Sequence, residues 1–291
     1  MKLKSLCSII ILAGFVFTTQ SISDSREVCK GFLPPNDLKI PVSIFNTGGL
    51  TEAQFNTVLD RIEKIYGPDI AAMGNRLKVN RLWDDPTVNA SANRSGKDFV
   101  INMYGGLARH AAVTEEGFAL VACHEIGHHI GGAPKVKGWF NNWASNEGAS
   151  DYFATLKCLR RYFASFESGD VLDKSEVSTF ARQSCEAQWV NLYDQEICLL
   201  NSLAGQSVAN LFADLRKDKA PPKFETPDPK KVSRIDDNHP ETQCRLDTYF
   251  QGALCISKIN EPLSDTDYRM GSCHEETDTV GLRPRCWFVP N

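Results

Sequence analysis

The sequence lacks a long apolar run. No stretch of eighteen consecutive apolar residues occurs in the 291-residue chain, whereas a helix needs roughly twenty such residues to cross a bilayer. We therefore expect no stable membrane insertion. The formal net charge is only -4, and lysines and arginines are scattered, so the charge gives no reason to expect binding to nucleic acid or to acidic membranes.

The N-terminus has the pattern of a removable signal peptide. Two lysines precede an apolar core of twelve residues, Leu6 to Phe17, and Ser21-Ile22-Ser23 matches a small-x-small cleavage site. Twelve apolar residues are too few to span a bilayer. We therefore expect residues 1–23 to be a signal peptide and the protein to be exported, either to a periplasm or to the extracellular space.

The cysteines indicate whether the protein is exported to an oxidising compartment and how its chain is cross-linked. No C-x-x-C occurs, which disfavours a tetracysteine zinc site. Cys7 would leave with the signal peptide, and an exported chain with nine further cysteines is expected to carry disulfides and one unpaired thiol. The nine are Cys29, Cys123, Cys158, Cys185, Cys198, Cys244, Cys255, Cys273 and Cys286.

Helix geometry restricts how these cysteines can pair. Cys244 and Cys255 are eleven residues apart in a predicted helix, which corresponds to about 16 Å, whereas a disulfide needs its Cα atoms within about 7 Å. The same argument disfavours Cys185 with Cys198 if their helix is continuous. We therefore expect long-range bridges between helices and the C-terminal tail.

Two further expectations concern individual cysteines. Cys273 with Cys286 is the one local pairing that remains open, and it would clamp the tail, residues 259–291. Cys123 lies in an apolar segment beside a histidine, and we predict that it is the unpaired cysteine.

The most informative motif is His124-Glu125-Ile126-Gly127-His128, an H-E-x-x-H sequence in a chain with only six histidines. Residues four apart lie on one face of a helix, so His124 and His128 can reach one metal ion. Glu125 falls beside that ion, where it could take a proton from a zinc-bound water. The alternative, two satisfied core histidines, is disfavoured because polar groups are costly to bury.

Local signals place this motif on a helix of about sixteen residues. Thr114 is a suitable N-cap, and two glutamates follow in the first turn, where the helix dipole favours acids. Gly131-Gly132 and then Pro134 end the helix. The motif therefore lies near the C-terminal end of a buried helix, where the partial negative charge suits a cation.

The next helix supplies candidates for a third ligand and its support. Catalytic zinc takes three protein ligands plus water. Glu147 follows His128 after eighteen residues, enough for a loop and a return, so Glu147 is the expected third ligand. Asp151, one turn later, could accept the second N–H of a ligand histidine, with His124 the expected partner. The alternative for both acids is a solvated charge at a helix start.

The pattern H-E-x-x-H followed by E-x-x-x-D resembles the gluzincin metallopeptidases. The segment Trp143 to Tyr152 is similar to the N-E-G-x-A-x-Y segment of aminopeptidase-N-like gluzincins, and the E-x-x-x-D pair is similar to that of thermolysin and of the HtpX, CaaX-prenyl-protease and BepA family. The resemblance covers about fifty residues, 114 to 163. It implies one Zn²⁺ per chain and peptide hydrolysis with Glu125 as general base.

A second segment, His239 to Leu246, resembles the H-P-x-x-x-x-R-[IL] segment of the HtpX and CaaX-prenyl-protease family. This resemblance implies that His239 stabilises the oxyanion or caps the zinc as a fourth ligand, and that Arg245 supports the site or binds substrate. A donor near the zinc would stabilise charge on the substrate carbonyl oxygen. The alternative is an ordinary His-Pro turn with Arg245 on a helix surface.

The sequence also departs from these families. A G-x-M-E-N segment of the aminopeptidase-N kind is absent, and residues 102–106 do not supply one, so endopeptidase action is favoured over aminopeptidase action. Membrane spans of the prenyl-protease kind do not flank the motif.

The element order predicts an α+β fold, with a small N-terminal sheet followed by a mostly α-helical chain, as the zincin-like resemblance implies. The last strand before the motif could be an edge strand that pairs with a peptide, or an interior strand. The expected strands are 38–45, 77–82 and 99–104, and the expected helices besides the two above are 51–66, 174–199, 202–216 and 240–257, with a loop over 217–238.

We therefore predict a zinc metallopeptidase domain over 24–258 and an irregular tail over 259–291. The expected function is an exported zinc metalloendopeptidase that acts on a protein or peptide substrate. Two alternatives remain open: another zinc hydrolase such as an amidase, and an exported, disulfide-stabilised zinc-binding or chaperone-like protein with a latent site. Three protein ligands would favour an enzyme, and four would favour latency or a structural role.

Overall fold

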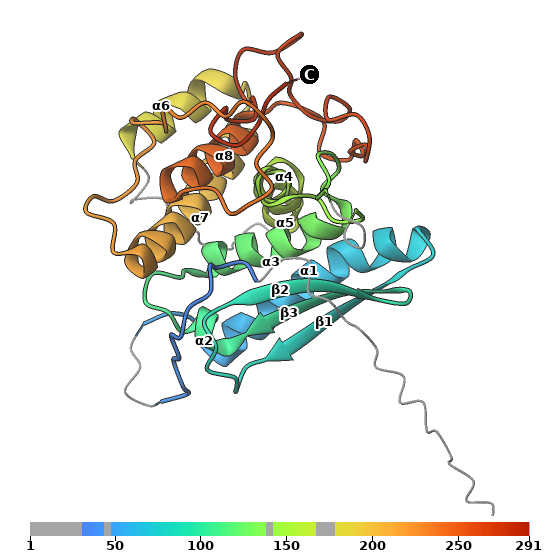
Figure 1. The fold of residues 1–291 in the computed structure, drawn as a ribbon, viewed down its shortest axis with the longest axis vertical. Helices are drawn as coiled ribbons and strands as arrows, with labels where there is room; N and C mark the ends of the chain where they lie inside the picture. Colours follow the sequence, from blue (N-terminus) through green and yellow to red (C-terminus); the bar gives the residue numbers. More distant parts are fainter. Residues whose placement is uncertain (1–30, 44–47, 138–141, 167–177, 291) are drawn as a thin grey trace, which may run out of the picture.

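The computed structural model describes residues 31–43, 48–137, 142–166 and 178–290. These residues form an α+β fold with one small sheet and a larger group of helices (Figure 1). In this part of the chain, no helix is long and apolar enough to cross a membrane. The elements are α1 (Glu52–Ala72), β1 (Arg76–Leu82), β2 (Ala90–Ser95), β3 (Asp98–Tyr104), α2 (Gly105–Ala108), α3 (Glu115–Ile130), α4 (Glu147–Phe153), η1 (Ala154–Cys158), α5 (Leu159–Ala164), α6 (Thr179–Gln188), α7 (Leu192–Arg216) and α8 (Thr242–Leu254).

The sheet has the order β1-β3-β2, with β3 parallel to β1 and antiparallel to β2. Two expected strands, 77–82 and 99–104, are therefore confirmed. The second of these is the interior strand β3, so an incoming peptide could not pair with it, and the outer strands are β1 and β2. Strand β2 was not predicted, because it consists of small and polar residues that have low strand propensity.

The expected strand over 38–45 is not formed in its described part. Lys39 makes only an isolated antiparallel bridge with Thr87, and residues 44–47 lie outside the described residues. Pro41 has no amide proton to donate to a ladder, which limits pairing here.

Helix α1 begins as expected but ends later. Thr51 and Gln54 form a reciprocal capping box at its start. The predicted stop at Gly67-Pro68 is wrong, because the helix continues to Ala72 with Pro68 inside it. Tyr66 and Ile70 are buried on either side of the proline, so packing against the core sustains the helix beyond a residue that weakens it locally.

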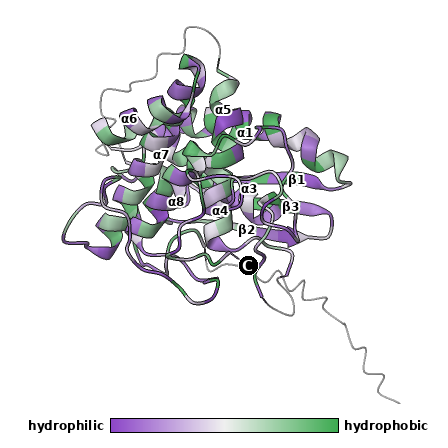
Figure 2. Ribbon diagram, turned by 90° about the horizontal axis from the view of Figure 1, so that it is seen from above, coloured by the Kyte–Doolittle hydropathy of each residue, from purple (hydrophilic) through white to green (hydrophobic). Residues whose placement is uncertain are grey.

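Helix α3 has the bounds that the capping signals predicted. The Thr114 hydroxyl accepts a hydrogen bond from the Gly117 amide at 3.1 Å, and the helix ends at Ile130. It lies between the sheet and the helices α4 and α7, and α8 packs on α4 and α7 (Figure 1). Hydrophobic residues gather around it in the middle of the molecule (Figure 2). Because α3 is covered on all sides, its histidines are buried with it.

The helix expected after the motif helix, which carries Glu147 and Asp151, is present as α4, η1 and α5. Asn146 caps its start, where its side-chain oxygen accepts a hydrogen bond from the Ala149 amide at 2.9 Å. The middle segment, Ala154–Cys158, is π-helical. Such wide turns inside α-helices are frequent at functional sites.

The expected helix over 174–199 is interrupted. Residues 167–177 lie outside the described residues, α6 ends at Gln188, and α7 starts at Leu192 and continues to Arg216. The Asn191 side chain caps α7 by accepting from the Asp194 amide at 2.8 Å. The loop over 217–238 and the final helix α8 agree with the prediction.

Within the described residues, four disulfides correct several expectations. Cys123 is not unpaired, because it bonds to Cys158 at the end of the π-helical segment. The break between α6 and α7 brings Cα of Cys185 within 5.8 Å of Cα of Cys198, and this pair is bonded. Cys273 does not pair with Cys286. The observed pairs are Cys123–Cys158, Cys185–Cys198, Cys244–Cys286 and Cys255–Cys273.

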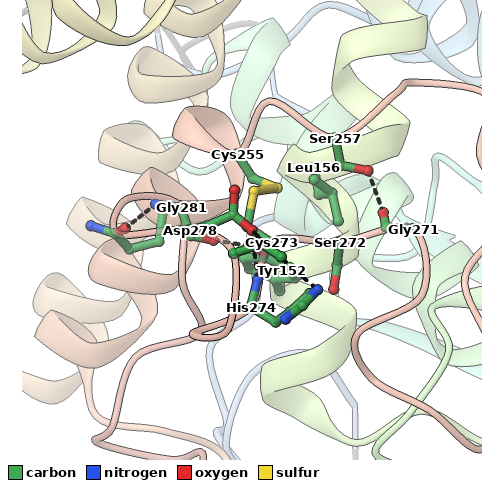
Figure 3. Close-up of a disulfide and its surroundings, with 12 residues drawn as sticks. Tyr152, Leu156, Cys255, Ser257, Gly271, Ser272, Cys273, His274, Asp278 and Gly281 are labelled. Atoms are coloured by element: carbon green, nitrogen blue, oxygen red, sulfur yellow. Dashed lines mark hydrogen bonds between the residues drawn. A yellow bond between two sulfur atoms is a disulfide. The ribbon is translucent and has the colours of Figure 1, made fainter.

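The described part of the tail, residues 259–290, contains no helix or strand and is held by disulfides. Two long-range bridges join it to α8 and the residue that follows it, as predicted, and the excluded Cys244–Cys255 pair does not form. Figure 3 shows the Cys255–Cys273 bridge beside Tyr152 and Leu156. Cys29 lies outside the described residues. Four disulfides indicate an oxidising, extracytoplasmic environment.

Candidate metal site

Three buried side chains from two helices converge on one point. Nε2 of His124 lies 3.4 Å from Oε2 of Glu147, and Nε2 of His128 lies 3.6 Å from Oε1 of the same carboxylate. One ligand atom from each of the three residues lies within 4.8 Å of the other two. The helical spacing of four residues places both histidines on one face of α3, and the Asn146 cap places Glu147 in the first turn of α4, opposite them.

The donor atoms fit a metal ion. His124 and Glu147 are almost completely buried. Within the described residues, Nε2 of His124 and both carboxylate oxygens of Glu147 have no hydrogen-bond partner, although buried polar atoms are nearly always bonded. Two imidazoles and a carboxylate are the donor set of catalytic zinc sites. The three residues can therefore hold a metal ion.

His124 is oriented by Asp151, as the helical spacing predicted. Its Nδ1 lies 2.7 Å from Oδ1 of Asp151, and both side chains are fully buried. A carboxylate here holds the proton on Nδ1 and leaves Nε2 facing Glu147. The same Asp151 oxygen accepts hydrogen bonds from Arg245 at 2.5 Å and from the Tyr249 hydroxyl at 2.9 Å.

His128 is oriented by a backbone carbonyl that the sequence did not reveal. Its Nδ1 lies 2.9 Å from the Ser145 oxygen. Because a carbonyl only accepts, Nδ1 carries the proton and Nε2 is the nitrogen that faces Glu147. The Ser150 hydroxyl lies 3.1 Å from the same nitrogen.

Arg245 lies under the site and not on a helix surface. Its side chain is fully buried, and Nη1 lies 3.9 Å from Oε2 of Glu147. The same nitrogen donates to the Phe32 carbonyl at 3.1 Å. The guanidinium also lies over the rings of Phe32 and Phe212, at 4.5 and 4.3 Å from their centres. Arg245 therefore neutralises the two buried acids and ties α8 to the N-terminal segment.

His239 reaches the edge of the site. Its Nε2 lies 3.5 Å from Oε2 of Glu147 and 2.8 Å from the carbonyl oxygen of Gly31. The carbonyl requires a proton on Nε2. In this tautomer Nε2 is a hydrogen-bond donor and offers no lone pair to a metal. Its side chain is 20% exposed, more than those of His124, His128 or Glu147.

Glu125 follows the first ligand candidate and is almost completely buried, at 1% exposure. Burial is the largest influence on its carboxyl and raises the pKa to about 8. The charge of His124 acts in the opposite direction and that of Glu147 in the same direction. Within the described residues, Oε1 of Glu125 has no hydrogen-bond partner.

Burial and charge also set the ionisation of the ligand candidates. Burial alone would lower the pKa of His124, but Asp151 and Glu147 outweigh it and raise the pKa to about 9. Burial lowers the pKa of His128 to about 4. Burial would raise the pKa of Glu147, yet the neighbouring histidines hold it well below its usual value. Glu147 is therefore a carboxylate and His128 a neutral imidazole, the forms that bind metals.

The N-terminal segment contributes residues that the sequence did not point to. The Phe32 ring meets the His124 ring edge-on at 4.8 Å between centres, and the Phe32 amide donates to the Ala90 oxygen at 2.8 Å. Tyr249, which bonds Asp151, was also missed. Its position four residues after Arg245 places both on the inner face of α8, but this spacing alone does not signal a function.

No family model, no curated protein and no solved structure matches this chain. The chemistry of the site is therefore inferred from its own residues.

Proposed function

We propose that the protein is an exported zinc metalloendopeptidase with a zincin-like fold and a gluzincin-type site. The observation that carries this proposal is the convergence of His124, His128 and Glu147, together with the buried carboxyl of Glu125, whose pKa responds to the charges of His124 and Glu147. The N-terminal signal pattern and the four disulfides support export.

Different residues of the chain would bind the metal, transfer the proton and orient the ligands during hydrolysis. His124, His128 and Glu147 would hold the zinc ion, which in such sites lowers the pKa of a bound water toward neutrality. Burial raises the pKa of Glu125, and a cation held beside it would oppose this effect and favour the carboxylate. That carboxylate would accept the proton of the attacking water and deliver it to the leaving amine. Asp151 and the Ser145 carbonyl keep Nε2 of the two histidines directed at the site.

Protein or peptide chains are the proposed substrates. An extended peptide can add to the edge of a sheet by backbone hydrogen bonds. Strand β2 is an outer strand and packs against α3, which carries the motif. It is therefore the proposed place for the substrate backbone.

Replacement of Glu147 tests the third ligand. Glu147→Ala should weaken zinc binding by more than roughly a hundredfold, beyond the range for residues that only orient ligands. Competition with a chromophoric chelator measures this affinity, and Glu225→Ala, at an exposed position, is the matched control. Unchanged affinity in Glu147→Ala would show that another residue completes the site.

His239 is proposed as a hydrogen-bond donor to the oxyanion and not as a fourth ligand, because the Gly31 carbonyl, 2.8 Å from Nε2, favours the tautomer with a proton on that nitrogen. His239→Ala should lower kcat by about 10²–10³-fold and leave zinc affinity within about threefold of wild type. A loss of affinity comparable with that of Glu147→Ala would instead identify a fourth ligand and favour a latent site.

A second candidate is an exported protein that keeps its metal for structure. The burial of all three ligand candidates and of Glu125 favours this alternative, because a catalytic site must admit its substrate. The two functions differ in one measurable property, which is whether the zinc-loaded protein cleaves peptide bonds.

A further inference from the structure

The tail packs directly against the helix that carries Glu147. Trp287 is fully buried, and its indole ring covers Gly148 so closely that a Cβ at position 148 would overlap the ring. The indole N–H donates to the Thr248 hydroxyl on α8 at 3.0 Å. The ring is thus fixed between α8 and the residue after the third ligand candidate.

A second set of contacts holds the N-cap of the same helix. The Asn146 side-chain amide donates to the Asp236 carbonyl at 3.3 Å and to the Asp237 carboxylate at 3.0 Å. The Asp236 amide in turn donates to the Trp287 carbonyl at 2.9 Å. The cap of α4 is therefore tied to the tail through one intermediate residue.

A third contact holds the other end of α4. Tyr152 lies beside the Cys255–Cys273 bridge (Figure 3), and its hydroxyl donates to the Gly281 carbonyl at 2.5 Å. Tail residues therefore contact α4 near both of its ends. Since the described tail has no helix or strand of its own, its conformation depends on its disulfides, which restrict an otherwise flexible chain.

The Cys244–Cys286 disulfide is placed to maintain these contacts. Cys286 precedes Trp287, and Cys244 precedes Arg245, which lies under Glu147. One covalent bond therefore fixes the neighbours of the third ligand candidate from the tail and from α8.

We propose that the disulfide-held tail is a positioning element of the metal site, with Trp287 as its central positioning residue. The tail fixes the first turn of α4 and thereby the carboxylate of Glu147, so the zinc affinity of the folded protein depends on the Cys244–Cys286 bond. This inference rests on the proposed zinc site.

The test compares two disulfide variants of the full mature chain. Cys244→Ser/Cys286→Ser should bind zinc about tenfold or more weakly than wild type, the effect expected when support of a ligand is lost. Cys185→Ser/Cys198→Ser is the matched control, because that bond joins helices that carry none of the ligand candidates. Zinc affinity is measured by chelator competition, at a temperature where circular dichroism shows all three proteins folded.

A rescue experiment applies even if the first variant does not fold. Gly148→Ala should weaken zinc binding because its methyl group displaces the Trp287 ring, and Gly148→Ala/Trp287→Leu should bind zinc more tightly than Gly148→Ala alone. Chemical denaturation of the metal-free variants distinguishes this recovery of zinc affinity from a recovery of stability.

The possible outcomes distinguish failure of the proposed function from failure of the role of the tail. Wild type that binds no zinc would overturn the proposed function and this inference together. Wild type that binds zinc, with equal affinity in both disulfide variants, would overturn only the role of the tail. Unchanged zinc affinity in Gly148→Ala would also overturn it.

Discussion

Glu125→Gln is expected to abolish peptide hydrolysis while the metal site stays intact. The amide has nearly the same shape as the carboxyl, and Glu125 is not one of the three ligand candidates. The glutamine amide cannot accept the proton of the attacking water. The rate of peptide hydrolysis should therefore fall by about 10²–10⁴-fold, the usual contribution of a general base. Cleavage of an unfolded protein substrate and zinc content are measured on the same preparation.

The matched control for this variant is Glu116→Gln, in the first turn of the same helix. It makes the same chemical replacement elsewhere on α3 and should leave both zinc content and cleavage unchanged. Equal cleavage by wild type and Glu125→Gln would rule out the mechanism. A wild-type protein that holds zinc without cleaving any substrate would favour the structural alternative.

Arg245→Met is expected to lower the free energy of unfolding strongly, and much more than a substitution in an exposed ion pair. Arg245 is fully buried beside Asp151 and Glu147, and methionine would fill similar space without its charge. Removing one partner from a buried ionic group leaves an uncompensated charge, which costs about 3–5 kcal/mol. Chemical denaturation of the metal-free protein gives the free energy of unfolding without a contribution from zinc binding.

Arg216→Met is the control for that loss. Arg216 pairs with Glu241 at positions where the side chains are 21% and 68% exposed, and such pairs contribute about 0–1 kcal/mol. Comparable losses of unfolding free energy in Arg245→Met and Arg216→Met would mean that the buried contacts of Arg245 contribute no more to stability than an exposed ion pair.

The part of the site that could be predicted is set by contacts close in sequence. Thr114 and the glycines after Ile130 fixed the bounds of the motif helix, because caps act within one turn. The spacing of four residues between Glu147 and Asp151 placed both acids on one face of α4. The hydrogen bond between Asp151 and His124 could then be predicted, because a metal-binding histidine usually donates its second ring N–H to an acceptor such as a carboxylate.

The remaining contacts depend on residues far apart in sequence. Phe32 meets His124 across 92 positions, and the Ser145 carbonyl meets His128 through a backbone position that carries no side-chain signal. The Cys185–Cys198 bond was disfavoured because a continuous helix was assumed, although Asn191 could have been identified as the cap of a new helix.

The contacts of the N-terminal segment indicate which cuts in the chain would disturb the site. The Gly31 carbonyl bonds His239, and the Phe32 ring lies against both His124 and Arg245. Leader removal after residue 23 would leave seven residues, 24–30, ahead of this segment. A cut beyond Phe32 would expose His124 and Arg245 on one side and remove an acceptor from each of two site residues. If a leader is removed, a cut before Gly31 would leave these contacts in place.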